Sequence, residues 1–113
     1  MSQRRGVFSA TVVPEAGRVR IEVAGEVDLE AEDRLIQTTR SALAPAPGAG
    51  TPVEEVVLDL GQVTFMDSSG LLAVLRCRDV VQGRGLALRM MVPGGPVARL
   101  FDVAGVTGHF DYC

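Results

Sequence analysis

The stretch Phe65-Met66-Asp67-Ser68-Ser69-Gly70-Leu71 lies between an apolar run, residues 56–60, and an amphipathic run, residues 71–81. The apolar run predicts a buried strand, because it is short, rich in branched residues and followed by Gly61. The apolar residues of the second run recur at helical spacing and predict a helix. This order of strand, turn and helix presents two hydroxyls and one carboxylate at a helix N-terminus.

Two strands are predicted on the N-terminal side of this stretch. Residues 7–13 are apolar and β-branched and lead into Pro14, which is typical of an edge strand. Residues 18–24 alternate between apolar and charged side chains, so one face of this strand packs on the core. The short turn at residues 15–17 joins the two strands as a hairpin.

A helix over residues 29–43 is predicted next. Asp28 suits its N-cap, because a carboxylate accepts hydrogen bonds from free backbone N–H groups and complements the helix dipole. The helix is indicated by residues at helical spacing: Leu29, Leu35, Ile36, Thr39 and Leu43. Residues 45–52, rich in proline and glycine, end the helix and predict a loop.

The C-terminal half continues the alternation of helices and strands. Arg76, Arg78 and Asp79 are predicted to face away from the core on the helix over residues 71–81, and Gly83 or Gly85 suits its left-handed cap. Residues 86–92 predict a strand. A short helix with Pro96 at its first position, extending to Val103, and a strand within residues 106–112 complete the chain.

The order β-β-α-β-α-β-α-β predicts an α/β fold: a mixed sheet with an N-terminal hairpin and helices packed mainly on one face. The 113 residues fit a single domain, 1–113. The net charge is −3, which argues against a nucleic-acid-binding protein. No apolar run approaches the roughly 18 residues of a membrane span. Cys77 and Cys113 lie far apart, so we expect a reduced, cytoplasmic protein without a metal site.

The residues do not support a catalytic role for the Asp67-Ser68-Ser69-Gly70 turn. A nucleophilic serine needs a base, and the only histidine, His109, lies in the terminal strand region and is predicted to be an ordinary surface or edge residue. The chain also has no lysine for a phosphate-cradling loop. Nothing in the sequence brings Asp28, Asp59 and Asp67 together. We therefore expect a protein that is not an enzyme and needs no cofactor.

Two interpretations of this turn remain open from the residues alone. In the first, Asp67 is simply an N-cap, worth ~1 kcal/mol, and Ser68 and Ser69 fill the first helical turn. In the second, the turn is a regulated contact. A phosphate on Ser68 would meet unpaired N–H groups at the helix start and add about −1.5 to −2 charges. Spacing does not decide between the two.

Three segments together resemble the signature of STAS-domain anti-sigma factor antagonists. They are Val56-Val57-Leu58-Asp59-Leu60 followed by residues 63–71, Gly25-Glu26-Val27-Asp28, and Arg99-Leu100-Phe101-Asp102-Val103-Ala104-Gly105-Val106. The resemblance implies a small cytosolic STAS domain that binds an anti-sigma factor and so releases a sigma factor for transcription. The anti-sigma factor is commonly a serine kinase that uses ATP, and a serine phosphatase reverses the modification.

The resemblance also implies roles for individual residues. The phosphoacceptor of the family is the first hydroxyl after the aspartate, which is Ser68 here, and its phosphorylation would switch the antagonist off. Asp28 and Asp67 match positions near the partner's nucleotide. Partner binding is therefore expected at Asp28, Asp67, Ser68, Ser69 and Gly70.

The chain departs from the family in two places. The family usually continues beyond the last strand into a C-terminal helix, whereas this sequence stops at Tyr112-Cys113. The loop at residues 45–52 is also longer and richer in glycine and proline than usual. These departures leave an alternative function, a non-catalytic STAS scaffold subunit of a larger signalling assembly.

Overall fold

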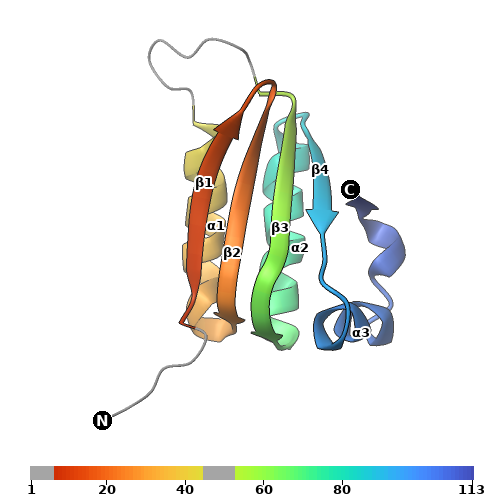
Figure 1. The fold of residues 1–113 in the computed structure, drawn as a ribbon. Coiled ribbons are helices and arrows are strands. Elements are labelled where there is room, and N and C mark those ends of the chain that lie inside the picture. The colour runs from red at the N-terminus through yellow and green to blue at the C-terminus, as the bar shows by residue number, and fades with distance from the viewer. Residues whose placement is uncertain (1–6, 45–52) are drawn as a thin grey trace.

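A computed structural model describes residues 7–44 and 53–113, which form a mixed sheet with helices (Figure 1). The predicted loop over residues 45–52 lies outside the described residues. The elements in chain order are β1 (Ser9–Glu15), β2 (Arg18–Val27), α1 (Leu29–Leu43), β3 (Glu55–Met66), α2 (Ser68–Gly83), β4 (Ala87–Met91), α3 (Pro96–Val103), the 3₁₀ turn η1 (Thr107–His109) and β5 (Asp111–Tyr112).

The five strands lie in the order β1-β2-β3-β4-β5. β1 pairs antiparallel with β2, and the remaining neighbours are parallel. The predicted hairpin and mixed sheet are thus confirmed, and β1 lies at one edge of the sheet, as predicted. α1 and α2 cover the same face of the sheet, while α3 lies below β4 in the view of Figure 1.

β3 extends beyond the predicted strand, which we expected to stop at Gly61. The strand continues to Met66 because it absorbs an extra residue at two places relative to β2. At the first place, the Asp59 carboxylate accepts a hydrogen bond from the Gly61 N–H at 2.8 Å. This local bond occupies an N–H group at the irregularity and lets the strand bend without ending.

The predicted last strand is mostly irregular. Within residues 106–112 only Asp111 and Tyr112 pair with β4, after the turn η1. The Thr107 hydroxyl donates to the Asp102 carboxylate at 2.6 Å, and the Tyr112 hydroxyl donates to the Thr107 carbonyl at 2.8 Å. These side-chain bonds hold the segment as a turn, which strand propensity alone does not reveal.

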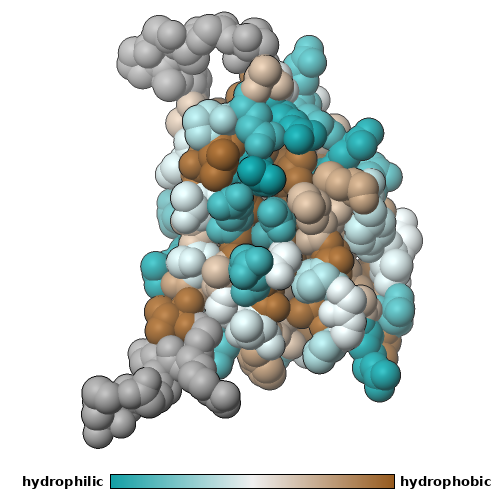
Figure 2. Space-filling model, in the orientation of Figure 1, coloured by the Kyte–Doolittle hydropathy of each residue, from teal (hydrophilic) through white to brown (hydrophobic). Residues whose placement is uncertain are grey.

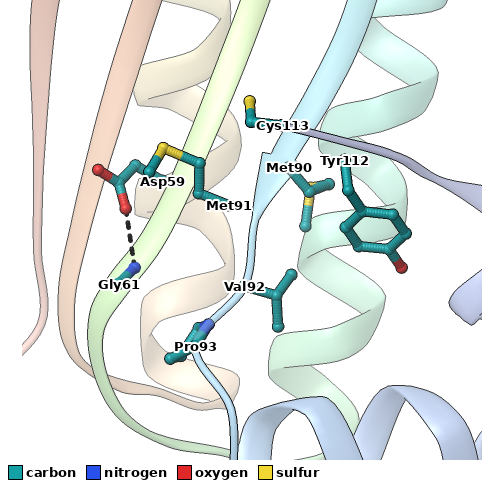
Figure 3. Close-up of a pocket in the computed structure, with 8 residues that line it drawn as sticks. All are labelled: Asp59, Gly61, Met90, Met91, Val92, Pro93, Tyr112 and Cys113. Carbon is teal, nitrogen blue, oxygen red and sulfur yellow. Dashed lines mark hydrogen bonds between the residues drawn. The ribbon is translucent and has the colours of Figure 1, made fainter.

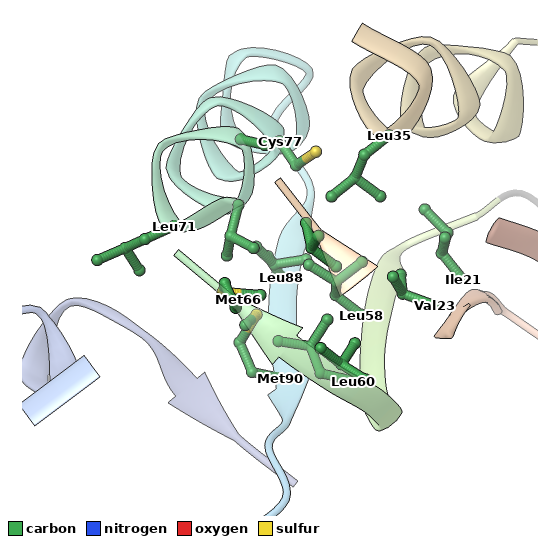
Figure 4. Packing of buried hydrophobic residues seen from close by; sticks show 14 of the residues in the cluster. Ile21, Val23, Leu35, Leu58, Leu60, Met66, Leu71, Cys77, Leu88 and Met90 are labelled. Carbon is green, nitrogen blue, oxygen red and sulfur yellow. The ribbon is translucent and has the colours of Figure 1, made fainter. Parts of the chain in front are cut away.

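The core lies between the sheet and the pair α1 and α2 (Figure 4). Its helix residues include Leu35 from α1 and Leu71, Val74 and Val81 from α2. The sheet contributes a layer of side chains that are at most 6% exposed: Val19, Ile21, Val23, Val56, Leu58, Leu60, Leu88 and Met90. Burial of this apolar area, at about 25 cal/mol per Å², is the main force that holds the two layers together.

Cys77 is part of this core and not a reactive thiol. Its side chain is fully buried, and the Thr39 hydroxyl lies 3.2 Å from its sulfur atom. Burial raises the pKa of the Cys77 thiol to about 11, against a small opposite effect from Thr39. The thiol therefore stays protonated at neutral pH, whereas Cys113 is exposed.

Of the two arginines of α2 predicted to face away from the core, Arg76 is exposed as predicted, whereas Arg78 is half-buried. Arg76 pairs with the Glu32 carboxylate of α1, which is itself only 8% exposed. The Arg78 guanidinium lies 5.9 Å from the centre of the Phe110 ring. Both contacts join α2 to elements that are distant in the sequence, so helical spacing within α2 does not disclose them.

The face of the sheet opposite the helices is polar. Arg18 and Arg20 both contact Glu15, at 2.7 and 3.3 Å, and Arg89 contacts Glu55 at 2.8 Å. The hydrogen bond from Arg18 lowers the pKa of the Glu15 carboxyl below its usual value. Figure 2 shows hydrophilic side chains gathered over the upper part of this face.

Candidate functional site

The site is built where β2 and β3 end side by side. Glu26 pairs with Phe65 and Val27 pairs with Met66, so the two parallel strands finish in register. Each strand is followed at once by an aspartate and a helix, α1 after β2 and α2 after β3. The starts of both helices are therefore neighbours at one end of the sheet, the carboxyl end at which α/β folds usually place their sites.

Asp28 and Asp67 both cap the helices that follow them. The Asp28 carboxylate accepts from the N–H groups of Glu30 and Ala31 at 3.1 and 3.3 Å. The Asp67 carboxylate accepts from the Gly70 N–H at 3.0 Å. Both capping predictions are thus confirmed. The caps occupy part of the free N–H groups at each helix start and leave the positive ends of two helix dipoles close together.

The two serines after Asp67 differ in their exposure. Ser68 is the first residue of α2 and is exposed, whereas Ser69 is half-buried. The sequence alone left the two hydroxyls equivalent. Ser68 is therefore the more accessible of the two hydroxyls at the start of α2.

Gly70 lets α2 approach the end of β2. A Cβ atom at this position would lie 2.1 Å from the Val27 carbonyl oxygen and 2.7 Å from the Met66 side chain. Gly70 itself is buried. Its place in the motif is therefore explained by close packing of backbone on backbone, which sets the position of Ser68 relative to Asp28.

Replacing Asp67 with alanine should lower the free energy of unfolding by about 1 kcal/mol, because the Gly70 N–H loses its cap. Asp67→Asn is the matched control, since asparagine caps nearly as well without the charge. Urea unfolding followed by circular dichroism measures both. An alanine variant as stable as the wild-type protein would contradict the capping role.

Two other hollows lack the features of a binding site. A depression of about 280 Å³ beside β4 is lined by Met91, Val92, Pro93 and Tyr112, and its carboxylate, Asp59, is already bonded to Gly61 (Figure 3). A groove of about 410 Å³ between α1 and α2 mixes acidic and basic side chains. Ligand sites usually combine an enclosed apolar pocket with a few convergent polar groups, and neither hollow does so.

The remaining candidates for chemistry lie apart from Ser68. His109 is exposed in η1, beside β5 at the far edge of the sheet from β3. Asp59 projects from β3 well before its end, so it does not join Asp28 and Asp67. Over residues 7–44 and 53–113 there is no group of three His, Cys, Asp or Glu side chains able to hold a metal ion. No helix in these two ranges is long and apolar enough to cross a membrane.

Sequence reasoning missed three large apolar side chains at this end of the molecule. Leu29, Phe65 and Leu72 are 69, 48 and 42% exposed. Leu29 fits the helical spacing that we assigned to the core face of α1, yet it is the first residue of the helix, just beyond the end of β2, and is exposed. A large apolar residue directly after an N-cap is the signal that marks it.

Comparison with known proteins gives the same fold. The STAS domain family matches residues 9–111. An anti-sigma factor antagonist from Mycobacterium paratuberculosis superposes with a TM-score of 0.76 at 22% identity, over 94% of this chain and 85% of that chain. The Bacillus cell fate determinant SpoIIAA in its phosphorylated form gives 0.62 at 20% identity, over 95% and 91%.

A third similar structure shows that the fold also occurs within larger proteins. The murine anion transporter Slc26a9 gives a TM-score of 0.68 at 16% identity, over 94% of this chain and 19% of the transporter. These identities are low, so the structural likeness establishes the fold alone. The match over residues 9–111 decides the family: this chain belongs to the STAS domain family.

Proposed function

We propose that this STAS domain is an anti-sigma factor antagonist that is switched off by phosphorylation of Ser68. Unphosphorylated, it binds an anti-sigma factor and releases the sigma factor for transcription. The anti-sigma factor is the serine kinase, and a serine phosphatase restores the active form. The domain itself is a cytoplasmic binding module and not an enzyme.

The observation that carries this proposal is the position of Ser68. Its side chain is exposed at the first residue of α2, while Ser69 is half-buried and Gly70 is buried. A kinase needs an accessible hydroxyl, and the start of α2 tolerates a phosphate there because helix N-termini favour negative charge. The similarity to the antagonists of Mycobacterium paratuberculosis and Bacillus adds support to this function.

The residues around Ser68 contribute in different ways under this proposal. Asp28 and Asp67 cap the starts of α1 and α2 with their carboxylates. Ser69 adds a second, partly covered hydroxyl. Gly70 contributes indirectly, because it is buried and permits the approach of α2 to Val27.

A release assay tests the function. Each complex of an anti-sigma factor with its sigma factor, purified from the source organism's repertoire, is mixed with this protein and resolved by size-exclusion chromatography. We expect one complex to lose its sigma factor to the unphosphorylated protein and to keep it when the protein has first been treated with the kinase and ATP. Retention of sigma in every complex would refute the antagonist function.

A further inference from the structure

A groove of about 410 Å³ lies between α1 and α2, which run side by side on one face of the sheet (Figure 1). Its mixture of charges does not suit a small ligand, but it suits a protein surface that carries matching charges. The lining includes four exposed charged residues and two half-buried apolar ones: Asp33, Ile36 and Arg40 of α1, and Arg76, Asp79 and Val80 of α2. The groove is therefore open to solvent and to another molecule.

The charged residues of the groove form one pair of opposite charges on each helix. On α1, Asp33 precedes Arg40 by two helical turns, so both lie on one side of the helix. On α2 the order is reversed, and Arg76 precedes Asp79 by one turn. Among the residues that the structure describes, Asp33, Arg40 and Asp79 take part in no ion pair, and Arg76 contacts Glu32. Both charge pairs are thus available for contact with another molecule.

Two contacts between α1 and α2 show how the charge pairs lie relative to each other. The Glu32 carboxylate contacts Arg76, and the Thr39 hydroxyl lies 3.2 Å from the Cys77 sulfur. The midpoint of the α1 charge pair falls between Glu32 and Thr39, and the midpoint of the α2 charge pair comes directly after Cys77. The two midpoints are therefore nearly level, so a single two-fold axis across both helices passes close to each of them.

We propose that this groove is the contact surface of a symmetric homodimer, in which α1 and α2 of a second copy lie antiparallel across α1 and α2 of the first. The members of each charge pair are equidistant from the two-fold axis. Asp33 therefore lies opposite Arg40 of the second copy, and Arg76 lies opposite Asp79 of the second copy. Closed two-fold dimers of this kind are the commonest soluble oligomers. The dimer goes beyond the proposed function and does not depend on it.

The same symmetry matches the uncharged positions of α2. Leu72 and Gly83 lie on the side of α2 that carries its charge pair, because the four positions are spaced three or four residues apart. Leu72 is 42% exposed, and nothing lies within 4 Å of a Cβ atom added at Gly83. These two residues are also equidistant from the axis, so Leu72 of each copy meets the open position at Gly83 of the other. The half-buried Ile36 and Val80 are covered at the centre of the contact.

The composition of this surface predicts a weak dimer that is sensitive to salt. Exposed ion pairs add little to affinity, so the charges mainly select the antiparallel register. Few apolar side chains are available to be buried in the contact. Sedimentation velocity of the wild-type protein, at concentrations up to about 1 mM, should show a monomer–dimer equilibrium. The dimer fraction should fall as salt is added, because salt screens the charges.

Charge reversal tests the register. Asp33→Arg and Arg40→Asp should each lower the association constant at least about tenfold, because each variant sets two pairs of like charges across the axis. An equal mixture of the two variants should form a heterodimer. In that heterodimer, position 33 of either copy again faces the opposite charge at position 40 of the other. Unchanged far-UV circular dichroism and melting temperature confirm that each variant is folded.

Two remote charge reversals serve as matched controls. Glu54→Arg and Arg99→Asp change the net charge by the same amounts at exposed positions outside α1 and α2. Both should dimerise like the wild-type protein. A wild-type protein that stays monomeric throughout, or a dimer that tolerates both groove variants, would overturn the proposal. Groove variants that dissociate but do not recombine on mixing would also overturn it, since the antiparallel register would be wrong. The antagonist function stands in each of these cases.

Discussion

Replacing Gly70 with alanine is expected to destabilise the domain by about 1–3 kcal/mol, the usual cost of forcing an extra carbon into a packed site. The added Cβ would meet the Val27 carbonyl oxygen at 2.1 Å, far inside contact distance, so the start of α2 must move away from β2. The direction of the change in unfolding free energy is informative, because Gly→Ala inside a helix normally stabilises the protein by up to about 1 kcal/mol. Urea unfolding of wild-type and variant protein measures the difference.

Gly83 provides the control for this substitution within the same helix. It is the last residue of α2, it is exposed, and nothing lies within 4 Å of an added Cβ. Gly83→Ala should therefore be neutral or stabilising by a few tenths of a kcal/mol to about 1 kcal/mol. If Gly70→Ala behaved like Gly83→Ala, the close approach of α2 to β2 would be wrong.

Ser68→Asp is expected to weaken binding to the cognate anti-sigma factor about tenfold or more, a loss of about 1.4 kcal/mol or greater. The substitution places a permanent negative charge at the exposed first residue of α2. Ser68→Ala should keep the affinity of the wild-type protein, because it removes only a hydroxyl. Titration calorimetry with the purified partner measures all three proteins.

Ser69 supplies the comparison within the same motif. Ser69→Ala should bind like the wild-type protein and should still lose its affinity after treatment with the kinase and ATP. Ser68→Ala should bind and become insensitive to this treatment. Equal affinity of Ser68→Asp and Ser68→Ala would contradict the switch, while a discrete large homo-oligomer in light scattering would favour a scaffold subunit.

Local signals in the sequence predicted much of the fold. The bounds of α1 follow from the Asp28 cap at its start and the proline that comes soon after Leu43, and the structure has the helix over the predicted residues. Gly85 takes the left-handed conformation expected after α2, and Pro96 is the first residue of α3. Each of these features depends on one or two residues that determine the conformation or hydrogen bonding of the adjacent backbone.

Features that depend on distant neighbours could not be predicted in this way. The extension of β3 past Gly61 depends on its pairing with β2, and the turn at residues 107–109 depends on Asp102. Arg76 of α2 forms a salt bridge with Glu32 of α1. The packing role of Gly70 depends on a carbonyl more than forty positions away in the chain, so the motif alone shows a glycine without its reason.

The features of the candidate site also separate into those that depend on local sequence and those that depend on tertiary packing. The sequence predicted Asp28 as a helix cap and offered capping as one interpretation of Asp67, because capping is a local property. It left Ser68 and Ser69 equivalent until the family resemblance favoured Ser68, and their difference in exposure arises from how α2 sits at the end of the sheet. The exposure of Leu29, Phe65 and Leu72 was missed because it is set by tertiary packing.

The most direct test of the account is to map the phosphate. The protein is incubated with the anti-sigma kinase that binds it and with ATP, and the modified residue is identified by tandem mass spectrometry of its proteolytic peptides. Because Ser68 and Ser69 are adjacent, fragmentation must separate the two positions, and Ser68→Ala provides an independent check. We predict a single phosphate on Ser68 and none in the Ser68→Ala variant. Phosphate on Ser69 with none on Ser68 would contradict the account.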